Sequence, residues 1–87
     1  MAYGMVEGRE IAGRYRFNRR RMKEIRIEAG MERRTVAEKA NIGVATYEKI
    51  EQGQRRHPSA EVVISIAAAL DTDPLDLFEP AATGLEW

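Results

Sequence analysis

The side chains of this sequence that could bind another molecule are mostly cations, and they are unevenly distributed. The segment from Arg9 to Arg34 holds ten Lys and Arg residues against four acids, whereas the segment from Pro58 to Trp87 holds six acids and neither Lys nor Arg. The formal net charge is zero, so a surface for a polyanion depends on separating these two ends in space. The basic end is suited to phosphate, and the acidic end would then face away from it.

The middle of the chain predicts a structure that could present such cations to DNA. Apolar residues recur at helical spacing over Arg33–Ala40 and again over Val44–Gln52, with Asn41-Ile42-Gly43 between them. Because this connection is too short for antiparallel packing, the two helices must cross steeply. That is helix-turn-helix geometry, in which the second helix projects and can enter a DNA major groove.

Three further helices are predicted around this pair. One covers Arg19–Ala29, one is capped by Ser59, and a last short one begins with Pro74 at its first position and ends at Pro80. The predicted fold is therefore all-α with five helices. The predicted parts of the chain are an N-terminal arm over 1–17, a helix-turn-helix domain over 18–79 and a C-terminal tail over 80–87.

Two charged residues fall on faces that the predicted helices turn inward. Arg26 follows the spacing of the apolar residues of its helix, and Glu51 lies next to the inward-facing Ile50. A charge at an inward position needs a partner, so we predict a partly buried Arg26–Glu51 ion pair. Removing one member should cost more than removing an exposed pair, because the other would be left desolvated and alone. Tyr47 is also expected in the core, with its hydroxyl reaching the surface.

Several classes of site are not expected. Cysteine is absent, which removes thiol chemistry and fits the reducing cytoplasm. The single histidine, His57, precedes Pro58 in a polar loop, where a hydrogen bond or phosphate contact is more plausible than catalysis. Asp71, Asp73 and Asp76 lack the spacing of a calcium loop and are interpreted as caps and solvated surface. We therefore expect no enzymatic activity, metal, cofactor, signal peptide or membrane span.

From Met22 to Phe78 the sequence resembles the Cro/CI-type (XRE) helix-turn-helix family of phage and bacterial regulators. The resemblance is carried by MKEIRIEAGM before the motif, TVAEKANI in its first helix, ATYEKIEQGQRRHPS after the turn, and VVISIAAALDTDPLDLF at the end. The combination of Glu51-x-Gly53, Pro58-Ser59, Ile66-Ala67 and Leu70 makes it specific. It implies a lambda-repressor-like DNA-binding domain, here with a basic N-terminal arm and a short C-terminal tail.

Phosphate contacts position a DNA-binding protein, and base contacts specify its site. Arg33 and Arg34 open the first motif helix, whose N-terminal dipole also favours an anion, and the run around Arg20 could add contacts. The resemblance implies that the loop after the second motif helix runs along the DNA backbone. The residues predicted to contact phosphate are Arg20, Arg33, Arg34, Gln52, Gln54, Arg55 and Arg56. The alternative for each of them is a solvated, charged surface.

Base reading is assigned to the outward face of the second motif helix, which is the recognition helix. The residues on the outward face of the recognition helix are Val44, Ala45, Thr46 and Lys49. Lys49 can donate to O6 or N7 of guanine, whereas Ala45 and Thr46 can touch a thymine methyl group. Val44 could equally be a core residue. Since no Arg, Asn or Gln offers a bidentate pair from this face before Gln52, DNA shape should supply part of the specificity.

The sequence thus predicts a sequence-specific transcriptional regulator that binds palindromic double-stranded DNA as a homodimer and acts as a repressor or autoregulator. Candidates for a dimer surface are Val62 and Ile64, which the segment Leu75–Trp87 could join. A further candidate is the segment Arg9–Phe17, which could cross to the partner subunit or reach toward DNA. That segment could be a helical turn, a strand or an arm. The alternative function is an antitoxin or other interaction module whose main partner is a protein, which the neutral charge and the apolar Val44-Ala45 tip would favour.

Overall fold

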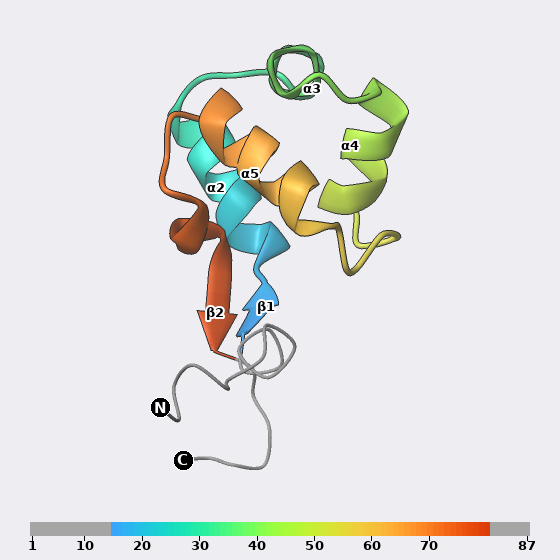
Figure 1. The fold of residues 1–87 in the computed structure, drawn as a ribbon. Helices are drawn as coiled ribbons and strands as arrows, with labels where there is room; N and C mark the ends of the chain where they lie inside the picture. The colour runs from blue at the N-terminus through green and yellow to red at the C-terminus, as the bar shows by residue number, and fades with distance from the viewer. Residues whose placement is uncertain (1–14, 81–87) are drawn as a thin grey trace.

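The computed structural model describes residues 15–80, which form a mostly helical body (Figure 1). Its four α-helices are α2 (Arg19–Glu28), α3 (Arg33–Ala40), α4 (Val44–Glu51) and α5 (Ala60–Ala69). The other elements are strand β1 (Tyr15–Phe17), the 3-10 turn η2 (Pro74–Leu77) and strand β2 (Phe78–Pro80). The predicted helical class is confirmed, but the count of five helices is not. In the described residues, a single 3-10 turn takes the place of the fifth helix.

Side-chain caps start the helices where the sequence supplies short polar residues. Asn18 and Ser59 accept hydrogen bonds from backbone N–H groups in the first turns of α2 and α5, at 2.9 and 3.2 Å. Asp73 caps η2 in the same way at 2.9 Å. Gly53 ends α4 in the left-handed region, with a φ of 86° that residues with a side chain adopt only at a cost. The three caps explain why the predicted starts of α2, α5 and η2 agree with the structure.

The two strands were not predicted as a pair. They run antiparallel, with Tyr15 opposite Pro80, Arg16 opposite Glu79 and Phe17 opposite Phe78. The two Phe rings meet edge to face with centroids 6.5 Å apart, so the pair joins the two ends of the described chain (Figure 1). The prediction that the last helix ends at Pro80 is therefore wrong, because Phe78–Pro80 is a strand. The basic arm over 1–17 is not confirmed, because 15–17 is a strand and 1–14 lies outside the described residues, as does 81–87 of the predicted tail.

The core collects side chains from α2, α3, α4, α5 and η2. The largest fully buried ones are Tyr47, Met22, Ile50, Ile66, Leu77, Val36 and Val63. Figure 1 looks along α3 while α4 lies across the view, so the two helices cross steeply as their short connection requires. Ala37 of α3 is fully buried, and Ile42 packs against the core from the corner between the helices. No helix within 15–80 has the length and apolar character needed to cross a membrane.

Candidate nucleic-acid interface

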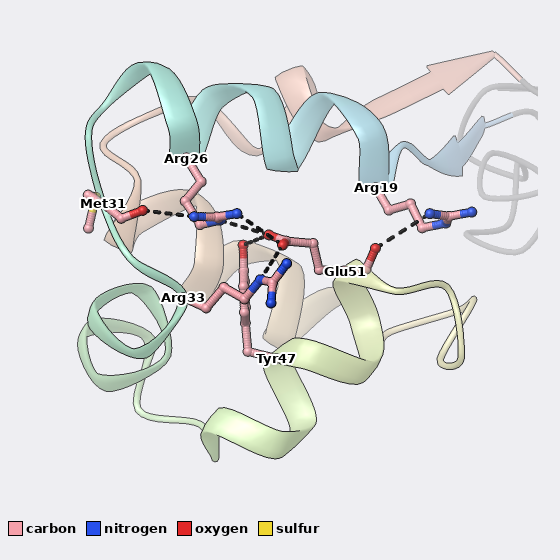
Figure 2. Close-up of polar contacts among 6 residues, drawn as sticks. All are labelled: Arg19, Arg26, Met31, Arg33, Tyr47 and Glu51. Carbon is pink, nitrogen blue, oxygen red and sulfur yellow. Dashed lines mark hydrogen bonds and ion pairs between the residues drawn. The ribbon is translucent and has the colours of Figure 1, made fainter.

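A buried carboxylate at the end of α4 joins three helices (Figure 2). The Glu51 side chain is 2% exposed and binds Arg26 of α2 through both oxygens, with Nε to Oε2 at 2.8 Å and Nη2 to Oε1 at 3.1 Å. Arg33, at the start of α3, donates from Nε to Oε1 at 2.8 Å. The Tyr47 hydroxyl donates to Oε2 at 2.8 Å. The cluster of Glu51, Arg26, Arg33 and Tyr47 therefore holds the recognition helix against both α2 and α3.

The structure brings together the two residues of the predicted ion pair and adds partners that the prediction missed. Arg33 is a second guanidinium on Glu51 and remains 41% exposed. Tyr47 is fully buried with its hydroxyl on Glu51, so the expectation that this hydroxyl reaches the surface is wrong. The i, i+4 spacing of Tyr47 and Glu51 on one helix was the signal for that contact. Arg26 also donates from Nη1 to the carbonyl oxygen of Met31 at 2.9 Å, which satisfies a further donor of the buried guanidinium.

Burial and hydrogen bonding act in opposite directions on the pKa of Glu51. Burial alone would raise it, but the hydrogen bonds from Arg26, Tyr47 and Arg33 outweigh burial and hold the pKa of this carboxyl below its usual value. The hydrogen bond to Glu51 raises the pKa of Arg26. Burial, followed by the hydrogen bond to Glu51, raises the pKa of Tyr47. At neutral pH the cluster is therefore a carboxylate between two guanidinium cations and a neutral phenol.

Folding stability should depend on the charge of Glu51 at acid pH. Because its pKa is lowered in the folded state, the carboxylate contributes stability that is complete above the unfolded value of 4.5. That stability is lost as the pH falls through the folded pKa. We expect the free energy of unfolding of the wild type, measured with urea from neutral pH down to about pH 3, to fall more steeply than that of Glu51→Gln. The variant should be less stable at neutral pH. If the free energies of unfolding of the wild type and of Glu51→Gln fell in parallel with pH, the Glu51 carboxylate would not be the source of this stability.

The five arginines among the residues predicted to contact phosphate fall into two groups in the structure. Arg20 at the start of α2 and Arg55 and Arg56 in the loop 52–59 line one open, basic hollow. Arg33 instead lies on the Glu51 cluster, and Arg34 beside it on α3 is exposed. The sequence alone had placed all these cations in one class, whereas the fold separates the arginines of the hollow from those at the start of α3.

The remaining predicted DNA contacts lie on α4 and directly after it. Gln52 and Gln54 are exposed, and the Gln54 side chain donates to the Gln52 side chain at 3.1 Å. Ala45 and Lys49 are exposed on α4 and Thr46 is half-buried, whereas Val44 is half-buried against the core. Lys49 is the one long hydrogen-bond donor among the four predicted base-reading residues.

Comparisons with known proteins bear on the fold and the family of the chain. The model of a family described as helix-turn-helix matches residues 22–77, which run from α2 to η2. A solved structure of the restriction-modification controller protein C.AhdI from Aeromonas hydrophila is similar, with a TM-score of 0.64 and 29% sequence identity over 68% of this chain and 88% of that chain. The comparison with curated proteins gave no match. The resemblance predicted from the sequence is confirmed, and the chain belongs to the XRE-type helix-turn-helix family of DNA-binding transcription regulators.

Proposed function

We propose that this protein recognises a specific double-stranded DNA site with α4 in the major groove, and that it represses transcription where it binds. The observation that carries the proposal is the buried Glu51 cluster. It ties α4 to α2 and α3, so the exposed Ala45 and Lys49 point in a fixed direction relative to the rest of the body. Base reading needs such a fixed direction, because hydrogen bonds to base edges tolerate little displacement.

Arg33 supports the proposal through the part of its guanidinium that Glu51 does not use. Its Nε donates to Glu51, and within residues 15–80 its two terminal nitrogens make no hydrogen bond (Figure 2). A guanidinium that is held through one edge and exposed at the other can present two donors to a phosphate oxygen pair. We therefore assign Arg33 a phosphate contact beside the recognition helix, with Arg34 next to it.

We further propose that two copies bind a two-fold symmetric operator. One unit of this size covers too little DNA for tight specific binding, and dimers on half-sites are the usual solution. Ile64 on α5 is 54% exposed and Leu75 on η2 is 75% exposed, so both offer apolar surface to a second copy. The same side chains would serve the alternative, an antitoxin or interaction module with a different protein as partner. Sedimentation of the purified chain as a dimer would support the homodimeric DNA-binding regulator. Sedimentation as a monomer would support the interaction module with a different protein as partner.

Selection of bound sequences from a pool of random DNA duplexes tests the proposal. We expect one symmetric site, with half-site centres about one helical turn apart, roughly 10 base pairs. Binding to that site should weaken steeply as the salt concentration rises, because phosphate contacts release counterions. A wild-type protein that enriches no sequence and binds no duplex even at low salt would refute the proposal.

Lys49→Ala should relax sequence preference at one base pair in each half-site. If Lys49 donates to a guanine, losing it should reduce discrimination at that position by about 1–3 kcal/mol and leave the preferences elsewhere unchanged. Competition binding with operator duplexes that each carry one base-pair change measures this. Lys39→Ala, which removes an exposed lysine from the end of α3, is the matched control and should keep the wild-type preferences. A Lys49→Ala protein with wild-type preference at every position would contradict the assignment.

A further inference from the structure

The strand pair β1–β2 has two open edges in the part of the chain that the structure describes. The sheet consists of these two strands, and Figure 1 shows the pair projecting from the helical body. An open strand edge presents backbone N–H and C=O groups that a further strand can bind. The register of the pair determines which of these groups point outward, and therefore which edge could accept another strand.

One backbone hydrogen bond fixes the direction of the groups on β1. The N–H of Asn18, directly after β1, donates to the carbonyl oxygen of Leu77 at 2.8 Å. Because hydrogen-bonded and non-hydrogen-bonded pairs alternate along antiparallel strands, the next hydrogen-bonded pair is Arg16 with Glu79. The backbone groups of the residues on either side of Arg16 therefore point away from β2.

These outward residues are Tyr15 and Phe17, and they form the outer edge of β1. Within residues 15–80 their backbone groups make no hydrogen bond to a turn, loop or cap. The Tyr15 side chain is 50% exposed. The outer edge of β2 is less suited to pairing, because Pro80 lies opposite Tyr15 and has no N–H to donate. A further strand would consequently add to β1.

The edge of β1 is complementary to a second copy of itself. If two β1 strands pair antiparallel about a two-fold axis at Arg16, Tyr15 of each copy lies opposite Phe17 of the other. Both residues have outward backbone groups, so each of these pairs can exchange both of its N–H to C=O hydrogen bonds. The neighbouring aromatic rings add a favourable cross-strand contact. Such a contact is isologous and closes at two copies.

The charges at the axis are compatible with this pairing. Arg16 would face Arg16 of the other copy, and like charges directly opposite one another are unfavourable. However, Nε of Arg16 already donates to Oε2 of Glu79 at 2.8 Å. The other oxygen of Glu79 accepts from the Asn18 side chain at 3.0 Å, which holds the carboxylate in place. Each copy therefore brings a neutral ion pair to the axis.

We propose that two copies of this protein dimerise through β1, so that their strand pairs form one continuous sheet in the order β2–β1–β1–β2. This inference rests on the proposed homodimer and names the surface that forms it. A second copy is the occupant to which we commit, because the edge matches its own image in register, backbone groups and charge. Association through the exposed Ile64 and Leu75 is the alternative that the test must distinguish.

Tyr15→Pro tests the proposal without removing a bond between β1 and β2. Proline lacks the N–H that would donate to the other copy, and that N–H points away from β2. Tyr15→Val is the matched control, because it also loses the ring but keeps the N–H. In sedimentation equilibrium, the Kd of the Tyr15→Pro dimer should exceed that of the Tyr15→Val dimer roughly tenfold or more, since each copy loses a backbone hydrogen bond. Ile64→Ser combined with Leu75→Ser should still dimerise.

Nuclear magnetic resonance of the wild type tests the same contact without a substitution. In a mixture of isotope-labelled and unlabelled copies, the Hα atoms of Arg16 in the two copies should give an intermolecular NOE. Residues at the axis would form a non-hydrogen-bonded pair, in which the Cα atoms lie about 4.5 Å apart. This measurement decides the question even if Tyr15→Pro fails to fold.

Three outcomes would overturn the inference and leave the proposed homodimer intact. Tyr15→Pro could dimerise as tightly as Tyr15→Val, or the dimer could lack the Arg16 NOE. Alternatively, the Ile64→Ser and Leu75→Ser variant could be monomeric while Tyr15→Pro remains dimeric, which would place the contact on α5 and η2. A wild type that stays monomeric both free and on its selected DNA site would instead refute the homodimer itself. The selection from random duplexes tests DNA recognition separately from either result.

Discussion

Arg26→Ala should lower the free energy of unfolding by about 3 kcal/mol. The substitution leaves the Glu51 carboxylate, 2% exposed, with Arg33 and the Tyr47 hydroxyl as its remaining partners. The partial compensation by Arg33 places the effect at the lower end of what breaking a buried ion pair costs. Since a domain of this size has only about 5–15 kcal/mol of stability and each kcal/mol is worth several degrees, the Tm should fall by more than about 10 °C.

Arg21→Ala is the matched control, because it removes the same residue type from the same helix. Arg21 is 45% exposed and pairs with Glu24 at 3.5 Å, three residues away on α2. Exposed pairs of this kind contribute less than about 1 kcal/mol. Urea and thermal unfolding of both variants at neutral pH measure the difference. If Arg26→Ala and Arg21→Ala cost the same, the buried cluster does not hold the recognition helix as described.

Replacing Arg55 and Arg56 together with Ala should weaken DNA binding by roughly tenfold to a hundredfold, by the same factor on every DNA sequence. Both side chains are exposed in the loop after α4, and neither has an ion-pair partner within residues 15–80. If both contact phosphate, the dependence of log affinity on log salt should become shallower by about 2. Folding stability should change by less than about 0.5 kcal/mol, since no described contact is lost.

Fluorescence anisotropy with a labelled operator over a range of salt concentrations measures this prediction. Lys39→Ala, an exposed lysine on α3 that no DNA contact is assigned to, should retain the wild-type affinity and salt dependence. The expected loss differs in kind from that of Lys49→Ala, which should alter preference at one base pair. An unchanged salt dependence in the double variant would place the loop 52–59 away from the DNA backbone.

Much of the helical framework could be predicted because its signals are local. The predicted helix Arg33–Ala40 agrees with α3 at both ends, and α4 starts at the predicted Val44. Periodicity, a capping side chain such as Asn18 and a left-handed residue such as Gly53 act within one or two turns, so the sequence contains them directly. The predicted helices over α2 and α4 each extended one residue too far, which is within the usual fraying of helix ends.

The strand pair and the last helix could not be predicted in the same way. Phe17 and Phe78 pair across the whole described chain, and three-residue strands carry too little alternation to be recognised alone. The segment Pro74–Leu77 has caps at its start, but it is too short for a series of α-helical hydrogen bonds and forms a 3-10 turn.

By itself, the sequence determined the helix-turn-helix motif, its family and the inward positions of Arg26 and Glu51, since these follow from residue types and from their spacing along each helix. Only the tertiary structure decided which cations are neutralised. It places Arg33 on Glu51 and Arg16 on Glu79, and it gathers Lys23 with Arg55 without a carboxylate partner in the described residues. The physical reason is that electrostatic interaction depends on distance in space, and for residues on different helices that distance is set by how the helices pack.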